Sequence, residues 1–238
     1  MKLDLLVFAA HPDDAELACS GTIAAHIAYG HSCGIIDLTK GEMGTRGTPA
    51  LRMEEASKSS EILGLQVREN LNFADIKFNN DWDHQLEVIK KIRQYQPQIV
   101  LANAVRDRHP DHGKAADLLR EAFFMAGLSK LKTVLNGEEQ EAFRPAHLYH
   151  YIQNDYIEPS FIVDISEFWE KKKSSIMAFK SQFYDPDNKE PDTFISSDKF
   201  IEFIEARSKE LGHRIGVRYG EGFTMSTTPG IKDVFSLV

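Results

Sequence analysis

The sequence predicts an α/β fold in which helices cover both faces of a mostly parallel β-sheet. Short apolar, β-prone runs alternate with longer helical segments through the first half of the chain, and alternation of this kind is typical of parallel sheets. Helix-stopping residues separate the segments, for example Gly64 after one predicted helix and Pro97 after another. The predicted strands are residues 3–10, 32–38, 67–73, 98–104, 147–153 and 161–165, and residues 215–219 are a candidate for closing the sheet.

The helices are predicted from periodicity and boundary residues. Residues 20–29 are rich in Ala and Ile and stop at Gly30, and residues 81–95 carry apolar side chains at helical spacing. Residues 110–126 begin with proline, which is tolerated in the first turn because no partner is lost for its missing amide. Further helices are predicted at residues 49–63, 166–179 and 197–211, with a loop at 184–193. No repeat or linker divides the chain, so we expect one domain over residues 1–238.

Composition narrows the class of protein. The 238 residues contain 28 Lys and Arg against 36 Asp and Glu, a net charge of −8, which argues against a nucleic-acid or anionic-membrane binder. The longest uninterrupted apolar run, residues 5–10, is too short to span a bilayer, and the N-terminus lacks the layout of a signal peptide. We therefore expect a cytoplasmic protein. Cys19 and Cys33 form no zinc-binding pair, so a metal would depend on His and carboxylate ligands.

Two clusters of His and Asp follow predicted strands. Residues 10–16, Ala-His-Pro-Asp-Asp-Ala-Glu, follow the first strand, and residues 107–112, Asp-Arg-His-Pro-Asp-His, follow the fourth. Ligands of open α/β sheets bind beyond the carboxyl ends of the strands, so both loops are expected at one edge. An imidazole and a carboxylate from the first loop with an imidazole from the second would hold zinc and leave one position for water. This arrangement is typical of a catalytic zinc site.

Each motif taken alone has a structural explanation. Asp13 and Asp14 can cap a helix, and Asp111 lies where a negative charge favours a helix start. His109 and His112 are three residues apart and can share an exposed helix face. The joint occurrence of both clusters at strand ends favours the metal site.

These motifs resemble those of the LmbE/PIG-L family of zinc-dependent de-N-acetylases. Residues 11–14 (His-Pro-Asp-Asp) and 109–112 (His-Pro-Asp-His) look like the paired metal motifs of that family, and the resemblance extends over about residues 3–223. Softer matches are residues 39–48, Arg52 with Glu55, residues 181–183 and residues 219–223. Many members have Glu directly after the two aspartates, whereas Ala15 stands here, as in the deacetylases of bacillithiol biosynthesis that act on N-acetylglucosaminyl malate. The resemblance implies a Rossmann-like three-layer sandwich.

The resemblance also assigns roles within the two clusters. It makes His11, Asp14 and His112 the ligands of one Zn²⁺ per chain, although Fe²⁺ or Mn²⁺ can occupy such a site. It makes Asp13 the general base that deprotonates the water at the metal, and it places His109 near the developing oxyanion or, if cationic, as the acid for the departing amine. Asp107 and Asp111 are expected to lie behind the ligands and orient them.

Arginines near the clusters suggest an anionic substrate. Arg52 and Arg108 are predicted to hold a carboxylate such as malate, and Glu42 to contact sugar hydroxyls, with ordinary ion pairs as the alternative for each arginine. We therefore expect a deacetylase of a small anionic amino sugar. The alternatives are a deacetylase of another amino sugar, such as a chitooligosaccharide, or a metal-dependent sugar-binding module without turnover. By resemblance, a homo-oligomer, either trimer or hexamer, is expected.

Overall fold

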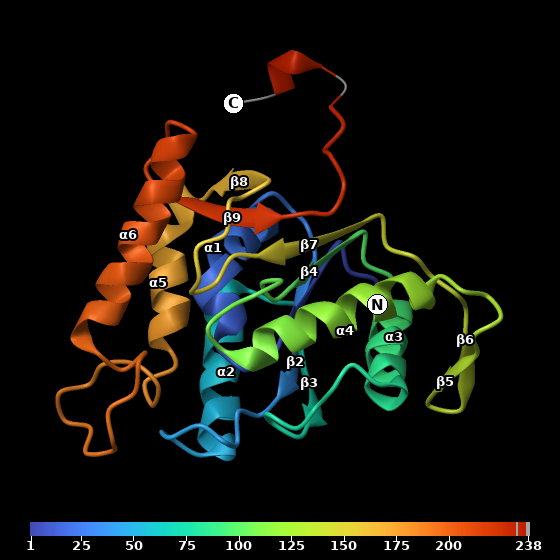
Figure 1. Cartoon of the computed structure of the whole chain (residues 1–238), viewed down its shortest axis with the longest axis horizontal. Coiled ribbons are helices and arrows are strands. Elements are labelled where there is room, and N and C mark those ends of the chain that lie inside the picture. Colours follow the sequence, from blue (N-terminus) through green and yellow to red (C-terminus); the bar gives the residue numbers. More distant parts are fainter. Residues whose placement is uncertain (232, 237–238) are drawn as a thin grey trace.

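A seven-stranded sheet forms the centre of the computed structural model, which describes residues 1–231 and 233–236 (Figure 1). The strand order is β3-β2-β1-β4-β7-β9-β8, and the first five of these strands are parallel. β9 runs antiparallel to both of its neighbours. The strands are β1 (Leu5–Ala9), β2 (Cys33–Thr39), β3 (Val67–Phe73), β4 (Ile99–Ala102), β7 (His147–Tyr151), β8 (Phe161–Asp164) and β9 (Gly220–Thr224). The predicted α/β class and mostly parallel sheet are confirmed.

Helices cover both faces of the sheet, and the central strand β1 is therefore buried on both sides. Leu6 and Phe8 point into one apolar cluster with the helices α3 and α4, whereas Leu5 and Val7 point into a second cluster with α1. A third cluster joins α5 and α6 beyond α1. The helices are α1 (Asp14–Ala28), α2 (Pro49–Leu63), α3 (Trp82–Tyr95), α4 (Pro110–Ala126), α5 (Trp169–Met177) and α6 (Asp198–Arg214), with short 3₁₀ turns at Ser166–Phe168 and Val234–Ser236. The three-layer arrangement follows from this double burial.

Local signals explain several helix boundaries. Thr48 caps α2, because its hydroxyl accepts the Leu51 amide hydrogen at 3.2 Å, and Gly64 ends the helix with φ of 84°. Asp81 caps α3 in the same way through the His84 amide. None of the described helices combines the length and apolar composition needed to cross a membrane.

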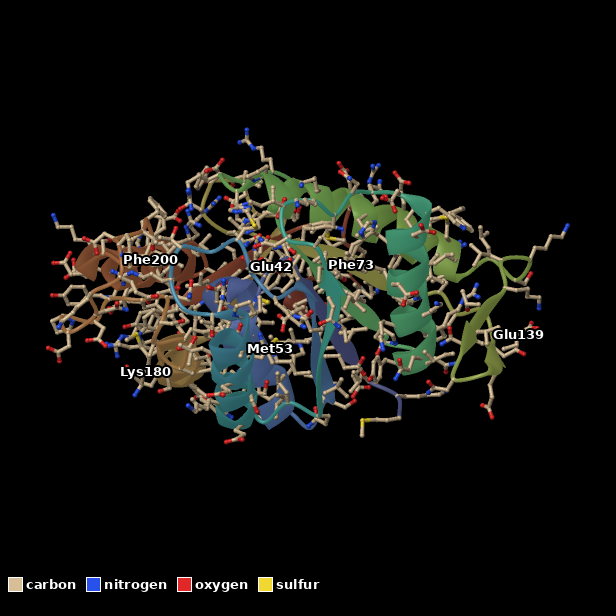
Figure 2. All side chains as sticks on the ribbon, turned by 90° about the horizontal axis from the view of Figure 1, so that it is seen from below. Glu42, Met53, Phe73, Glu139, Lys180 and Phe200 are labelled. Atoms are coloured by element: carbon tan, nitrogen blue, oxygen red, sulfur yellow. The ribbon has the colours of Figure 1, made fainter. Side chains whose placement is uncertain are left out.

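The largest differences from the prediction concern three elements. α1 begins at Asp14 instead of residue 20, because the Leu17 amide already bonds to the Asp13 carbonyl. The closing strand is Gly220–Thr224 instead of 215–219, because α6 continues to Arg214 and the chain then turns back through a bond from Val217 to Gly212. A hairpin of β5 (Thr133–Leu135) and β6 (Glu138–Gln140) was not expected from the sequence; Figure 2 shows its Glu139 at the opposite end of the molecule from Phe200 of α6.

A buried ion pair connects three elements of the fold. The run of three lysines at 171–173 suggests a solvated helix face, but Lys172 is only 1% exposed. Its ammonium lies 2.5 Å from the Glu221 carboxylate and donates to the Leu17 carbonyl at 2.9 Å. Lys173 is exposed, because successive helical residues point in different directions and only Lys172 faces α1. Glu221 also accepts the backbone amides of residues 21 and 22, so this pair joins α5, β9 and α1.

Replacing Lys172 by Met should therefore destabilise the protein by about 3–5 kcal/mol, because it leaves the buried Glu221 carboxylate without its cation. Urea unfolding measures the effect. Lys173→Met is the matched control on the same helix and should change stability by no more than about 0.5 kcal/mol. Equal stability of the two variants would show that the pair does not hold these elements together.

Candidate metal centre and active site

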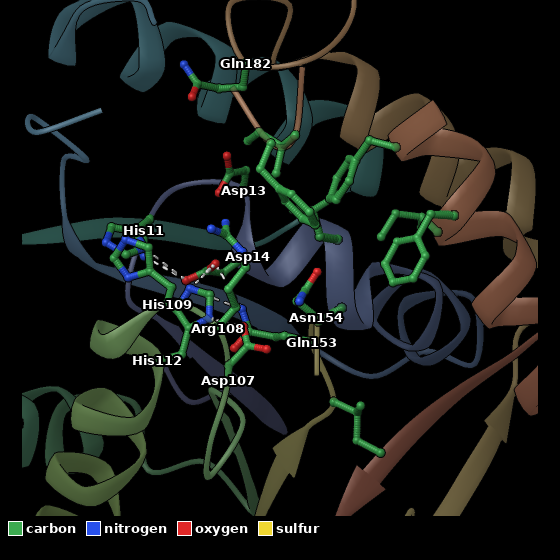
Figure 3. A pocket seen from close by; sticks show the side chains of 18 of the residues that line it. His11, Asp13, Asp14, Asp107, Arg108, His109, His112, Gln153, Asn154 and Gln182 are labelled. Atoms are coloured by element: carbon green, nitrogen blue, oxygen red, sulfur yellow. Dashed lines mark hydrogen bonds and ion pairs between the residues drawn. The ribbon is translucent and has the colours of Figure 1, made fainter. Parts of the chain in front are cut away.

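The two predicted loops meet at the carboxyl ends of the neighbouring strands β1 and β4. Ring nitrogens of His11, His109 and His112 approach within 4.8 Å of one another (Figure 3). The ring centres of His11 and His109 are 4.7 Å apart, and those of His109 and His112 are 5.2 Å apart. The parallel register of β1 and β4 produces this meeting, because it places the loop after each strand at the same edge of the sheet.

Asp14 lies between two of these histidines. Its carboxylate is 3.0 Å from Nε2 of His112 and 3.6 Å from Nδ1 of His11. Burial alone would raise the pKa of Asp14, but the two imidazoles outweigh burial and hold the pKa well below its usual value. The acid is therefore ionised, as a metal ligand must be.

Carboxylates hold the remaining ring nitrogen of both histidines. Nδ1 of His112 is 2.6 Å from Asp107, while Nε2 of His11 is 3.0 Å from Asp75 and 3.4 Å from Asp111. Such outer carboxylates fix the orientation of an imidazole and the nitrogen that it presents to a metal. Asp107 and Asp111, for which the sequence suggests an orienting role, thus lie against the imidazoles of His112 and His11. His11, Asp75 and Asp111 also form a second close group of potential ligand atoms, which shares His11 with the first.

The donor set fits a divalent metal. His11, Asp14 and His112 offer two imidazoles and one carboxylate, a combination that zinc, iron and manganese accept. Burial alone would lower the pKa of His112, but Asp14 and Asp107 raise it to about 9. Asp14 and Asp107 therefore favour a positive charge at the position of this imidazole. A bound metal cation would supply that charge in place of the proton.

Two amide side chains that sequence reasoning missed hold Asp14. Asn103 donates to one carboxylate oxygen at 3.0 Å, and Gln153 donates to the other at 3.0 Å. Gln153 also accepts from Asn103, which fixes the orientation of both amides. Asp75 was missed as well. All three residues stand within two positions of the carboxyl end of a strand, and polar residues at such ends are the signal that could have identified them.

Asp13 has a strained backbone and a buried carboxylate. Its φ of 117° lies in a region that residues with a side chain rarely adopt, and strain of this kind accumulates at functional sites. Burial raises the pKa of Asp13 to about 7, while the positive charge of Arg52, 2.8 Å away, opposes the shift. The Asp13 carboxyl can thus exchange a proton near neutral pH.

His109 is held in its neutral form. Its Nδ1 accepts the Asp111 amide hydrogen at 3.3 Å, which assigns the proton of the neutral ring to Nε2. Burial lowers the pKa of His109, and the charges of His11 and His112 lower it further. His109 can therefore donate a hydrogen bond from Nε2, but the structure does not favour the cationic form that an acid role would need.

The structure corrects the expected roles of Arg52 and Glu42. Arg52 is only 5% exposed, and its guanidinium donates to Asp13 and to the Pro12 carbonyl instead of standing free for a substrate carboxylate. Gly41 makes this position accessible, because a Cβ there would clash with the guanidinium. Glu42 accepts the Asp75 amide hydrogen at 2.8 Å and is absent from the cavity wall, so it supports the loop of Asp75.

Arg108 remains as a cation at the mouth of the cavity. It is exposed, its guanidinium lies 4.3 Å from the ring centre of Phe194, and within residues 1–231 and 233–236 it forms no ion pair. Arg46, by contrast, is buried and bonds to carbonyls of the segment 183–191 and to Asp192. Among Arg46, Arg52 and Arg108, only Arg108 is placed to meet an anion.

One cavity, which opens to solvent, contains these groups. Figure 3 shows His11, Asp14 and His112 on one side and the side chains of α6 on the other, with Asp13 and Gln182 at a further edge. The first half of the chain thus supplies the His and Asp groups, and the second half supplies the opposite wall.

The chain is similar to several known proteins of related sequence and structure. The family model of the GlcNAc-PI de-N-acetylases (PIG-L) matches residues 6–123. The diacetylchitobiose deacetylase of Thermococcus kodakarensis is 28% identical over 233 residues, covering 93% of this chain and 81% of that protein. The 4-oxalmesaconate hydratase of Pseudomonas putida is 29% identical over 192 residues, covering 74% and 73%. A solved structure of a conserved protein from Thermus thermophilus is 38% identical, covers 98% of both chains and has a TM-score of 0.86.

The chain belongs to the PIG-L family. It is accordingly an enzyme of the deacetylase class, a hydrolase that acts on amide bonds, with a His/Asp group suited to a metal.

If Asp107 orients His112, Asp107→Asn should weaken zinc binding about 10–100-fold, because a neutral amide holds the imidazole less firmly in its ligating form. Competition with a chromogenic chelator measures the affinity. Asp117→Asn, an exposed change on α4, is the control and should leave the affinity unchanged. Equal affinities in the two variants would contradict the orienting role.

Proposed function

We propose that this enzyme removes the N-acetyl group of a glucosamine conjugate, most specifically N-acetylglucosaminyl malate in bacillithiol biosynthesis, and releases acetate and a free amine. The observation that carries the reaction is the buried Asp13 carboxyl beside His11, Asp14 and His112 in one cavity. Family membership supports an amino-sugar substrate. The exposed Arg108 in the wall of the cavity supports the malate group.

The metal ligands are His11, Asp14 and His112 in this proposal, with zinc as the metal and Fe²⁺ or Mn²⁺ as alternative occupants of the same donors. When bound, such a cation lowers the pKa of water and polarises a carbonyl oxygen. Asn103, Gln153 and Asp107 hold the ligands in place, so little rearrangement is needed during the reaction.

Asp13 acts as the base. It takes a proton from water as the water oxygen attacks the acetamide carbon, and it returns this proton to the nitrogen when the C–N bond breaks. Arg52 holds the Asp13 carboxyl at 2.8 Å, which fixes its direction within the strained loop. Asp13 thus both accepts and donates the proton, so the amine can leave without a separate cationic acid.

His109 stabilises the negative oxygen of the tetrahedral state. A neutral imidazole with its proton on Nε2 donates a hydrogen bond to this oxygen, and this contact strengthens as charge develops. This role agrees with the lowered pKa of His109 and replaces the acid role in the mechanism.

The diacetylchitobiose deacetylase among the relatives supports an alternative substrate, a chitooligosaccharide. The two substrates differ in charge, because malate carries carboxylates and a chitooligosaccharide carries none. An exposed arginine without a carboxylate partner within the described part of the chain favours the anionic substrate. Amine release from N-acetylglucosaminyl malate and from diacetylchitobiose, measured with the metal content of the same sample, tests the proposal.

Asp13→Asn should retain zinc and lose activity by about 10²–10⁴-fold, because an amide cannot accept the proton of water. Metal analysis and amine release measure the two effects. The comparison variant Asp14→Asn should lose zinc together with activity. Unchanged deacetylation by Asp13→Asn would exclude Asp13 as the base.

Arg108→Ala should reduce kcat/KM for N-acetylglucosaminyl malate about 10–100-fold, because it removes a charge-assisted contact to the malate carboxylate. The value of kcat/KM for N-acetylglucosamine should change by no more than about twofold. Arg106→Ala, which removes another exposed arginine outside the cavity wall, is the matched control. An equal loss on both sugars would rule out a carboxylate contact by Arg108.

A further inference from the structure

The cavity extends beyond the groups needed for an acetyl group. Past Asp14 its wall becomes apolar, and we call this part the apolar chamber. The apolar chamber is lined by Leu17, Ala18, Ile152, Phe200, Ile204 and Leu211. These side chains come from α1, from the segment after β7 and from α6, and Figure 3 shows the side chains of α6 facing the metal-binding group across the cavity.

The apolar chamber begins directly beside the reacting groups. Leu17 follows Asp13 by four residues and Ala18 follows Asp14 by four, so each apolar side chain lies one helical turn behind an aspartate on the same face of α1. A substituent on the carbon held at Asp13 and Asp14 can therefore enter the apolar chamber without passing the mouth of the cavity.

The charged groups of the buried Lys172–Glu221 pair already have hydrogen-bond partners within the protein. Lys172 and Glu221 also line the cavity, and they bond to each other, to the Leu17 carbonyl and to amides of α1. Asn154, Arg207 and Ser208 are the polar side chains of the wall. Arg207 donates to the Asn154 carbonyl and stacks on Phe203, whereas its Nη1 and the Asn154 Oδ1 have no hydrogen-bond partner within the described residues. A sugar hydroxyl placed against the six apolar side chains would lose its hydrogen-bond partners, whereas an alkyl chain needs none.

We propose that the apolar chamber receives the acyl chain of N-acyl amino sugars whose acyl group is longer than acetyl. This proposal rests on the amide hydrolysis proposed above and extends its substrate class to medium-length N-acyl groups. The amide C–N bond breaks, water supplies the new C–O bond, and the products are a fatty carboxylate and the free amine. The sugar then lies toward the mouth near Arg108, where hydroxyls and charges remain hydrated.

Binding of N-acetyl-, N-butanoyl- and N-hexanoylglucosamine to the Asp13→Asn variant tests the proposal without turnover. Each added methylene should tighten binding about fourfold until the apolar chamber is filled. Calorimetry measures the dissociation constants. Hexyl N-acetylglucosaminide, which carries its alkyl chain on the other side of the sugar, should bind no more tightly than N-acetylglucosamine.

A variant that fills the apolar chamber tests the location in the active enzyme. Ser208→Leu places a larger side chain in the wall and should lower kcat/KM for N-hexanoylglucosamine at least about tenfold. The value of kcat/KM for N-acetylglucosamine should change by no more than about twofold. Ala206→Leu adds the same side chain to the exposed side of α6 and is the control. If Ser208→Leu lowers the melting temperature strongly, Ile204→Ala is the second variant, and it should improve activity on the hexanoyl amide relative to the butanoyl amide.

Several results would overturn the proposal. Hexanoyl and acetyl amides that bind equally, a tighter complex with the hexyl glycoside alone, or equal losses on both amides in Ser208→Leu each exclude an acyl chain in the apolar chamber. Failure of the proposed function is distinct: the parent enzyme would release no amine from any N-acetyl sugar, whereas the calorimetric series would still report chain binding.

Discussion

The buried carboxylate of Asp14 is the interaction on which the rest of the site depends. It accepts from the His11 backbone, from Asn103 and from Gln153, and it meets the two imidazoles. These partners come from the loops after β1, β4 and β7, so one charge joins three adjacent strand ends. A buried ion needs such partners, because an unpaired carboxylate in this environment would be strongly unfavourable. The chemistry of the site and the alignment of the parallel strands thus depend on the same residue.

Acidic groups surround the histidines, and this surplus of negative charge suits the site to a cation. Asp75, Asp107 and Asp111 lie behind the imidazoles, and their charges are only partly neutralised by backbone amides and Lys114. The protein thereby holds two imidazoles with defined directions and leaves a positive charge to be supplied. Asp13 differs from these acids, because its partner is Arg52 and its backbone is strained. The separation of a ligating acid from a proton-accepting acid follows from these different environments.

The cavity has two chemical halves that suit two ends of one substrate. The mouth carries the exposed Arg108 and is polar, whereas the interior is formed by apolar side chains of α1 and α6. Relatives of this chain include a deacetylase and a hydratase, so the walls of the cavity, more than the fold, decide the substrate. α6 supplies much of the inner wall, and substitutions on that helix offer a direct route to altered specificity.

Sequence alone determined the elements and the two His/Asp clusters, because strand periodicity, helix boundaries and closely spaced chemical groups are local features. Residues 49–63 and 110–126 match α2 and α4, and the segments containing His11 and His112 lie together at one edge of the sheet. Only the tertiary structure decided that Lys172 is buried, that Arg52 serves Asp13, and that Asn103 and Gln153 hold Asp14. Those contacts join residues far apart in the chain, and their existence depends on how strands and helices pack. The type of a residue and its sequence neighbours indicate which chemical roles it can have. Its burial in the folded protein and the charges nearest to it decide which of those roles it performs.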